Sequence, residues 1–248
     1  MSVADVETIS LVAEIEALVD GVPGWSPIDQ LFALSLLVHT TSHLRGDVVE
    51  VGSWLGRSAI ALGAAARDTH GVVHCIDPFP ARGDWRRNGD GTYSCAVQID
   101  GRRHESYQEQ TVWAEAFEQH LAPVYATHAS VLDAFLDNTR SRGLGAVVKP
   151  HRGTAATFAE QVPSSFQCRL LFLDGDHGYH AVGDDIARLA PFLVPGGWIC
   201  FDDAFSSYEG VDRAIVDLVI DNPAYDLTRQ LTRKCFAARK TLRQGPWE

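Results

Sequence analysis

Five stretches of the sequence carry side chains that could do chemistry, and they follow short apolar runs. Ligands of open α/β sheets bind outside the carboxyl ends of the strands, so these stretches would meet at one edge of a parallel sheet. They supply a backbone turn for a nucleotide-like ligand, an acid for sugar hydroxyls, and a cluster of acids with a histidine. The stretches are residues 52–58, Asp77, residues 153–155, residues 174–177 and the pair Asp202-Asp203.

The first stretch is a glycine turn. It comes after the apolar run of residues 48–51, which only Glu50 interrupts. Gly52 and Gly56 bracket the turn, and a helical pattern starts at Arg57. A buried strand, a glycine turn and a helix N-terminus form a cradle for a nucleotide-like ligand. Many glycine turns only reverse the chain, so this interpretation depends on the ends of the later strands.

Asp77 ends the next apolar run, residues 72–76, and completes a strand–helix–strand unit of about 30 residues. A carboxylate at this position can accept hydrogen bonds from both hydroxyls of a ribose. A helix or turn cap is the other common use of such an acid. Glu50 precedes Asp77 in register, which favours the ligand interpretation.

Other nucleotide and hydrolase motifs are absent from the sequence. It contains no GxxxxGK[ST] phosphate loop, which argues against an NTPase, and no GxGxxG, which argues against a dinucleotide reductase. It also lacks the GxSxG turn of α/β-hydrolases.

Composition limits the class of protein further. A formal net charge of −11 argues against a nucleic-acid partner, because phosphate binding favours a basic face. None of the five cysteines lies in a CxxC pair, which favours buried thiols in a reducing compartment over disulfides or a zinc site. The acidic N-terminus lacks a signal-peptide pattern, and no apolar run approaches the roughly 18 to 20 residues that span a bilayer. We therefore expect a cytoplasmic protein with no membrane partner.

Strand and helix patterns alternate along most of the chain, which predicts a parallel α/β sheet. The last pattern, around residues 224–239, could form an antiparallel pair at the edge of this sheet. Residues 195–197 read as a turn before a strand. The later strands are expected at residues 146–148, 170–173 and 198–201, and the helices at residues 57–69, 131–142, 179–192 and 211–221.

Two parts stand outside this alternation, within one domain of residues 1–248. Residues 1–45 hold two helical patterns, 6–18 and 28–43, which either cover the sheet or form a lid or dimer contact. Residues 78–128 form an insertion on the carboxyl side of the sheet, with a helix expected over residues 107–121. A loop this long is usually functional or mobile, so the insertion is a candidate substrate lid. Its candidate wall residues are Trp85, Tyr93, Trp113 and Phe117, which a plain packed insertion would explain equally well.

The motifs together resemble a known family. Residues 50–58 look like motif I of class I S-adenosylmethionine-dependent methyltransferases. Residues 173–179, residues 193–197 and the pair Asp202-Asp203 are similar to the small-molecule group of macrocin-type O-methyltransferases and cephalosporin-hydroxylase-like proteins. The resemblance implies a doubly wound, Rossmann-like α/β fold. Its sheet would be seven-stranded and mostly parallel, with helices on both faces and an antiparallel C-terminal edge.

The resemblance also gives the cofactor-binding residues their roles. Glu50 and Ser58 would fix the ammonium and carboxylate of S-adenosylmethionine, and Asp77 would take the ribose hydroxyls. The methionine part would lie on the glycine turn and the adenine beside residues 153–155. The implied set is Glu50, Gly52, Ser53, Gly56, Ser58, Asp77, Gly153, Thr154, Ala155 and Asp174.

Metal-dependent relatives bind magnesium at positions that match Asp174, Asp202 and Asp203. Three carboxylates converging at strand ends repel one another unless a hard dication lies between them, and the ion would hold and acidify a substrate hydroxyl. Capping is the alternative use of Asp202 or Asp203. His177 stands where catechol-type relatives carry a lysine base, so His177 or Asp174 would take the hydroxyl proton. The alternative for His177 is a turn histidine bound to the cofactor backbone.

The expected activity is magnesium-assisted methyl transfer from S-adenosylmethionine to a hydroxyl of a small molecule. The acceptor would be a sugar or phenol of natural-product or antibiotic biosynthesis, and the enzyme a homo-oligomer. One alternative is metal-independent N-methylation of a small-molecule amine. Another, from a different class, is a non-catalytic binding protein with a cofactor fold.

Overall fold

The computed structural model describes residues 3–107 and 111–242. At its centre lies a seven-stranded sheet of order β6-β2-β1-β7-β8-β10-β9. β6, β2, β1, β7 and β8 pair in parallel, whereas β10 is antiparallel to both β8 and β9. The predicted mostly parallel sheet with an antiparallel C-terminal pair is therefore confirmed. Its strands are β1 (Asp47–Val51), β2 (Val73–Asp77), β6 (Val148–Arg152), β7 (Cys168–Leu173), β8 (Leu193–Phe201), β9 (Tyr225–Gln230) and β10 (Phe236–Lys240).

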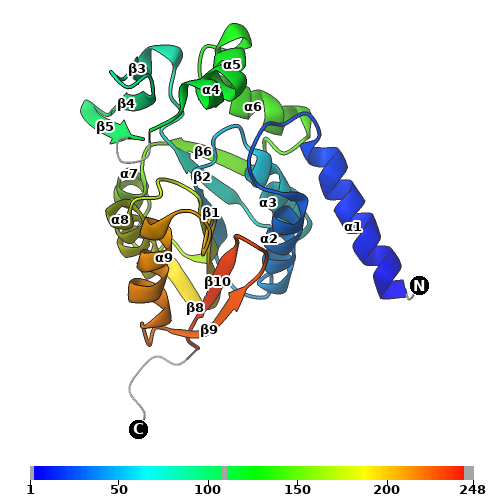
Figure 1. The fold of residues 1–248 in the computed structure, drawn as a ribbon. Helices are drawn as coiled ribbons and strands as arrows, with labels where there is room; N and C mark the ends of the chain where they lie inside the picture. The colour runs from blue at the N-terminus through cyan, green and yellow to red at the C-terminus, as the bar shows by residue number, and fades with distance from the viewer. Residues whose placement is uncertain (1–2, 108–110, 243–248) are drawn as a thin grey trace.

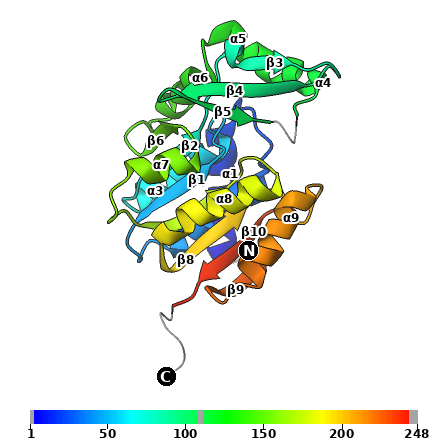
Figure 2. The same ribbon diagram turned by 90° about the vertical axis from the view of Figure 1, so that its left-hand side faces the viewer.

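Helices cover both faces of this sheet (Figures 1 and 2). On one face α1 and α2 pack against α3, and α6 lies beside them, while α7, α8 and α9 cover the other face. The order of elements is that of a doubly wound fold, as expected. The helices are α1 (Val3–Val19), α2 (Ile28–Thr40), α3 (Arg57–Asp68), α6 (Val131–Ser141), α7 (Ala155–Gln161), α8 (Tyr179–Leu189) and α9 (Glu209–Ile215).

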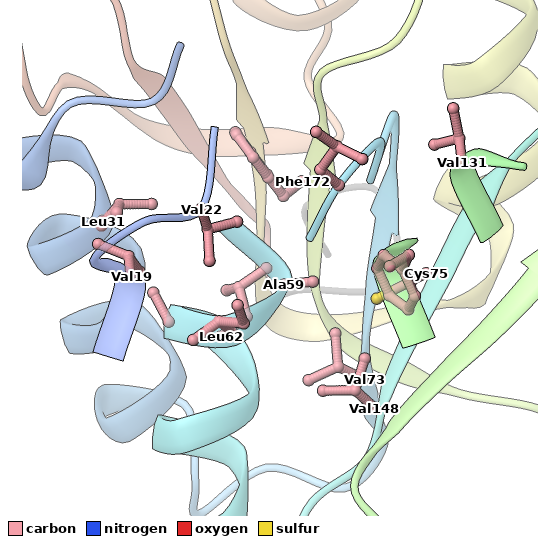
Figure 3. Close-up of a cluster of buried hydrophobic side chains, with 14 of the residues drawn as sticks. Val19, Val22, Leu31, Ala59, Leu62, Val73, Cys75, Val131, Val148 and Phe172 are labelled. Atoms are coloured by element: carbon pink, nitrogen blue, oxygen red, sulfur yellow. The ribbon is translucent and has the colours of Figure 1, made fainter. Parts of the chain in front are cut away.

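The buried side chains of the central strands alternate between two apolar clusters, as the period of two in a strand requires. In β1, Val48 belongs to the cluster under α3, and Val49 belongs to the cluster under α8. β7 repeats this with Phe172 and Leu171. Figure 3 shows the first cluster, in which Ala59 and Leu62 of α3 lie between Leu31 of α2 and the strand residues Val73 and Cys75. Burial on both faces explains why these strands are continuously apolar in the sequence.

Two predicted boundaries are wrong. The strand expected at residues 146–148 is β6, which starts at Val148 and includes Pro150. β6 is one of the two edge strands, where a residue without an N–H group is tolerated. Residues 195–197 lie inside β8, where the register against β7 shifts and Gly196 has a φ of +82°. They form a bulge within the strand, so the turn predicted before the strand is wrong.

The insertion of residues 78–128 folds mainly as a small antiparallel sheet of order β3-β4-β5, which the sequence analysis missed. The helix expected over residues 107–121 begins only at Ala114, and residues 108–110 lie outside the described residues. Figure 2 places the insertion at one end of the main sheet. Its elements are β3 (Trp85–Arg87), β4 (Tyr93–Ile99), β5 (Arg102–Ser106), α4 (Ala114–Ala116), a π-helical turn (Phe117–Leu121) and α5 (Ala122–Thr127).

Most of the candidate wall residues form the insertion's own core. Tyr93 stacks on Phe117 at 3.9 Å between ring centroids, and both side chains are buried. Trp85 is buried as well, and its indole N–H donates to the Tyr125 hydroxyl at 2.7 Å. Trp113 alone of the four is exposed, at 74%. For three of the four, packing is therefore the role that the structure supports.

The helices expected in residues 6–18 and 28–43 are confirmed as α1 and α2. Within residues 3–107 and 111–242, no helix is both long and apolar enough to cross a membrane. All five cysteines are buried.

Candidate functional site

The predicted site residues meet at the carboxyl edge of the parallel strands. Backbone hydrogen bonds of 2.9–3.0 Å tie the ends of neighbouring strands together just where these residues begin. The residues after β1, β2, β6, β7 and β8 therefore form one continuous rim. The bonds run from Gly52 N to Ile76 O, from Gly153 N to Asp77 O, from Asp174 N to Val51 O and from Asp202 N to Leu173 O.

Gly52 lies directly against the strand end that carries Asp174. It has a φ of +87°, and a Cβ atom there would collide with the carbonyl group of Asp174. Both the backbone conformation and the close approach therefore require glycine at this position. The contact brings the glycine turn and the acid–histidine stretch to adjacent positions on the rim.

Glu50 is the most unusual group of the site because it is a fully buried carboxylate. Within the described part of the chain, neither of its oxygens has a hydrogen-bond donor in normal geometry, and the same holds for the Ser53 hydroxyl. Burial raises the pKa of Glu50, and the nearby Ser53, Ser58 and Cys75 only partly offset this. A buried unpaired carboxylate is costly, so this position fits a cationic ligand group such as the ammonium of S-adenosylmethionine.

Asp77 holds the glycine turn in place. Its carboxylate accepts the backbone N–H groups of Trp54 at 2.9 Å and Phe79 at 2.6 Å. Burial raises the pKa of Asp77 to about 6, although these two hydrogen bonds lower it. Each carboxylate oxygen keeps a second acceptor position, so Asp77 can cap the turn and still accept ribose hydroxyls. The two uses considered for Asp77 are compatible.

Residues 153–155 lie beside Asp77, at the start of α7. The Thr154 hydroxyl accepts from Thr157 N at 3.3 Å, and the Thr157 hydroxyl accepts from Thr154 N at 2.8 Å. This reciprocal capping uses the side chain of Thr154. Ala155 is buried, and Gly153 has no room for a Cβ atom against Thr157. The segment therefore offers an adenine no charged side chain, only its backbone and the partly exposed Thr154.

The acid–histidine stretch forms a second cluster next to the glycine turn. His177 Nε2 lies 3.2 Å from Asp203 Oδ2, and the imidazole stacks on the Tyr208 ring at 4.2 Å between centroids. Burial opposes ionisation of Asp203, but His177 and Lys234 lower its pKa below the usual range. Burial and the neighbouring Asp202 raise the pKa of Asp174 well above its usual value.

The three carboxylates predicted as magnesium ligands do not form a metal site in this arrangement. Lys234 Nζ lies 2.9 Å from Asp202 Oδ2 and 3.1 Å from Asp203 Oδ1. Across residues 3–107 and 111–242, no group of three His, Cys, Asp or Glu side chains is arranged to hold a metal ion. The ammonium group lies where the dication was expected.

Lys234 was not predicted as a site residue, although the sequence carries a signal for it. Lys234 precedes β10, and β10 pairs antiparallel with β8 so that Phe236 lies opposite Phe201. A residue just before β10 must therefore lie near the residues just after β8, which are Asp202 and Asp203. The antiparallel pair was predicted, but its order in the sheet was not.

Two further residues near the site were not assigned a role. Arg57, within the motif, donates to the carbonyl groups of Val19, Val22 and Ser26 at 2.9–3.1 Å and so fixes the α1–α2 connection against α3. Tyr107, from the insertion, is near enough to Asp77 and Asp174 that these acids, after burial itself, raise the pKa of its hydroxyl. The insertion therefore reaches the rim.

The sheet order, with antiparallel β10 beside β8 and acids at the ends of β1 and β2, defines the class of Rossmann-like folds that bind nucleoside-containing cofactors. A family model described as a methyltransferase domain matches residues 49–204, and the chain belongs to this family. It is an S-adenosylmethionine-dependent methyltransferase, as the resemblance of residues 50–58 implied.

Several solved structures share the fold. The O-methyltransferase NovP is 18% identical, with a TM-score of 0.64, and the match covers 94% of this chain and 99% of NovP. TomG from Streptomyces achromogenes, an O-methyltransferase involved in tomaymycin synthesis and solved with S-adenosylmethionine, is 15% identical, with a TM-score of 0.53 and coverage of 95% and 90%. CalS11, a TDP-rhamnose 3'-O-methyltransferase of calicheamicin biosynthesis, is 15% identical, with a TM-score of 0.54 and coverage of 96% and 95%.

Proposed function

We propose that this enzyme transfers a methyl group from S-adenosylmethionine to a hydroxyl group of a small molecule. The observation that carries the proposal is the pair of His177 and Asp203, a proton acceptor held by a carboxylate at the rim beside the glycine turn. A hydroxyl must lose its proton as it attacks, whereas a neutral amine attacks through its lone pair without a base.

The residues around the glycine turn fit the cofactor. When bound, S-adenosylmethionine supplies a methyl group on a positively charged sulfur. Glu50 would hold the amino group of its methionine part, because it offers a buried carboxylate without another donor. Asp77 would accept the ribose hydroxyls, and the backbone of residues 153–155 would line the adenine. Gly52, Gly56, Ser53 and Ser58 would shape the turn around the methionine part, with Asp174 beside it.

His177 is the proposed general base. His177 Nε2 lies 3.2 Å from Asp203 Oδ2, so the carboxylate would orient the imidazole that takes the hydroxyl proton. Asp203 then stabilises the resulting imidazolium by its charge. Asp174 is the second candidate for this role. Magnesium assistance does not enter the proposal, because Lys234 stands between the carboxylates that would hold the ion.

We propose a sugar or phenol of natural-product biosynthesis as the acceptor, in a homo-oligomeric enzyme of the cytoplasm that forms one domain with its insertion as a lid. TomG and CalS11 act in tomaymycin and calicheamicin biosynthesis and support this context. Tyr107 supports the lid, because this residue of the insertion lies near enough to Asp77 and Asp174 for their charges to raise its pKa. A small-molecule amine is the second candidate acceptor, since an amine needs no metal and Lys234 takes the position of one.

A methyl-transfer screen tests the proposal. The protein is incubated with S-adenosylmethionine and a panel of amino sugars, macrolide sugars and phenols, and products are analysed by mass spectrometry and NMR. We expect O-methylated products. Exclusive N-methylation would establish the amine alternative. Binding of S-adenosylhomocysteine without turnover of any acceptor would argue for the non-catalytic alternative, and loss of turnover in a His177→Ala variant would support the assigned base.

A further inference from the structure

We propose that the ammonium group of Lys234 replaces the divalent cation in this enzyme and makes its methyl transfer independent of metal. This inference rests on the proposed function. The ammonium bridges two carboxylates that follow β8, at 2.9 Å from Asp202 Oδ2 and 3.1 Å from Asp203 Oδ1. The side chains are largely withdrawn from water, with 12% of Lys234, 3% of Asp202 and 18% of Asp203 exposed.

The two distances are those of an ammonium hydrogen-bonded to carboxylates. Magnesium would need the same oxygens at about 2.0–2.1 Å in octahedral geometry. An ion placed between Asp202 and Asp203 would lie within a few ångström of Lys234 Nζ, and the like charges would repel in a site with little water. The dication and the ammonium therefore exclude each other, and only removal of Lys234 would release the oxygens.

The backbone fixes Lys234 at this position. The carbonyl group of Lys234 accepts from Ala204 N at 2.9 Å, which ties the β9–β10 connection to the segment after β8. Thr232 closes the same connection, since its hydroxyl accepts from Cys235 N at 3.2 Å. Cys235 is fully buried. The lysine stem thus starts from an anchored turn beside the acids, unlike a mobile surface lysine.

Lys234 affects the reaction through the position of His177. Asp203 uses Oδ1 for Lys234 and Oδ2 for His177, so the ammonium fixes the carboxylate that orients the base. In the reaction the acceptor oxygen forms a bond to the methyl carbon, the carbon–sulfur bond breaks with its electron pair remaining on sulfur, and the hydroxyl proton passes to His177. Lys234 touches none of the reacting atoms in this scheme. It is a positioning residue.

Manganese binding tests the inference directly. Mn²⁺ is titrated into the full-length wild-type enzyme, Lys234→Met, Lys234→Arg and a control, Arg233→Met, which removes an exposed positive charge from the same connection. Bound ion is measured by electron paramagnetic resonance, and calorimetry with S-adenosylhomocysteine verifies that each variant is folded. We expect Lys234→Met to bind Mn²⁺ at least about tenfold more tightly than the other three proteins, because it alone loses the buried cation.

Turnover provides the second measurement. Wild-type activity should not change with EDTA, kcat should fall in Lys234→Met with KM for the cofactor retained, and Lys234→Arg should restore most of kcat. The inference is overturned if the wild-type enzyme binds Mn²⁺ as tightly as Lys234→Met does, or if EDTA abolishes wild-type activity. The EDTA result uses the wild-type enzyme alone, so it overturns the inference even where Lys234→Met does not fold. A failure of the proposed function would appear separately, as absence of S-adenosylhomocysteine binding or of any methylated product, because Mn²⁺ binding does not depend on an acceptor.

Discussion

Replacing Glu50 by glutamine should have opposite effects on cofactor affinity and on stability. The buried carboxylate of Glu50 has no hydrogen-bond donor among the described residues. A hydrogen bond to a charged group contributes about 1.5–3 kcal/mol, so loss of the charge should weaken S-adenosylmethionine binding by roughly 10- to 150-fold. In the cofactor-free protein the same change removes an uncompensated buried charge. The free energy of unfolding should therefore rise by about 1–2 kcal/mol, and Tm by about 2–8 °C.

The effect on stability should depend on pH with a defined sign. Because burial raises the pKa of Glu50 in the folded protein, its protonated form contributes stability that is fully present below the ordinary pKa of 4.5. That contribution is lost as the pH rises through the folded-state pKa. The difference in Tm between Glu50→Gln and wild type should therefore grow from acid to neutral pH.

Isothermal calorimetry gives the affinity, and differential scanning calorimetry without cofactor gives Tm. Glu160→Gln is the matched control, because its carboxylate lies in an exposed ion pair with Arg102 at 3.6 Å and should change neither quantity. A Glu50→Gln variant that kept full cofactor affinity, or that was less stable than wild type at neutral pH, would refute the assignment of Glu50 as the anion that binds the ammonium group of the cofactor.

Three more predictions address the rim. Burial raises the pKa of Asp77 from 3.8 to about 6. The stability that protonated Asp77 contributes is therefore fully present below pH 3.8 and is lost as the pH rises through about 6. Thermal scans of wild type and Asp77→Asn without cofactor should show this pH-dependent difference in Tm, and saturating S-adenosylhomocysteine should reduce the difference. His177→Ala should lower kcat by about 10²–10³-fold in steady-state assays without changing the Kd of the cofactor. If kcat and cofactor affinity fell by the same factor, His177 would not be the general base. Gly52→Ala should lower the free energy of unfolding in urea by about 3 kcal/mol or more, because its φ is +87° and a Cβ meets the strand end at Asp174. Gly101 has a φ of +75° and no atom within 4 Å of an added Cβ, so Gly101→Ala should lower the free energy of unfolding by only about 1–2 kcal/mol. Equal losses in the two variants would exclude a collision between a Cβ at position 52 and the strand end at Asp174.

The fold could be predicted from the sequence where one physical signal dominates. Residues 48–51 and 170–173 are apolar because both faces of their strands are buried, and this alone identifies central strands of a parallel sheet. Polar residues directly after such runs must lie at one edge, which is why Asp77 and Asp174 could be placed on one rim. At β6 the sequence pattern gave the wrong strand bounds, because the strand contains Pro150. A proline within a run argues against a strand unless the strand lies at the edge of a sheet.

The rest depends on contacts that a local pattern does not contain. The hairpin of β4 and β5 turns at Asp100 and Gly101, a dipeptide typical of tight turns, but the exposed side chains of β5 give no apolar alternation. The bridge from Lys234 to Asp202 and Asp203 joins parts of the chain about 30 residues apart. Its prediction requires the order of strands, which hydrophobic periodicity does not specify. The magnesium prediction rested on the three acids alone and did not include the cation that faces two of them.

The strand order also separates the proposed cofactor-binding groups from the proposed proton acceptor. Strand order reverses between β1 and β7, and ligands of such sheets bind at that point. β6, β2 and β1 carry the proposed cofactor groups, including Asp77 and Glu50, whereas β7, β8 and β10 carry His177, Asp203 and the lysine before β10. The contact of Gly52 with the strand end at Asp174 lies on this boundary. The methyl group must therefore cross there, and the proton acceptor must stand on the β7 side within reach of it, as His177 does.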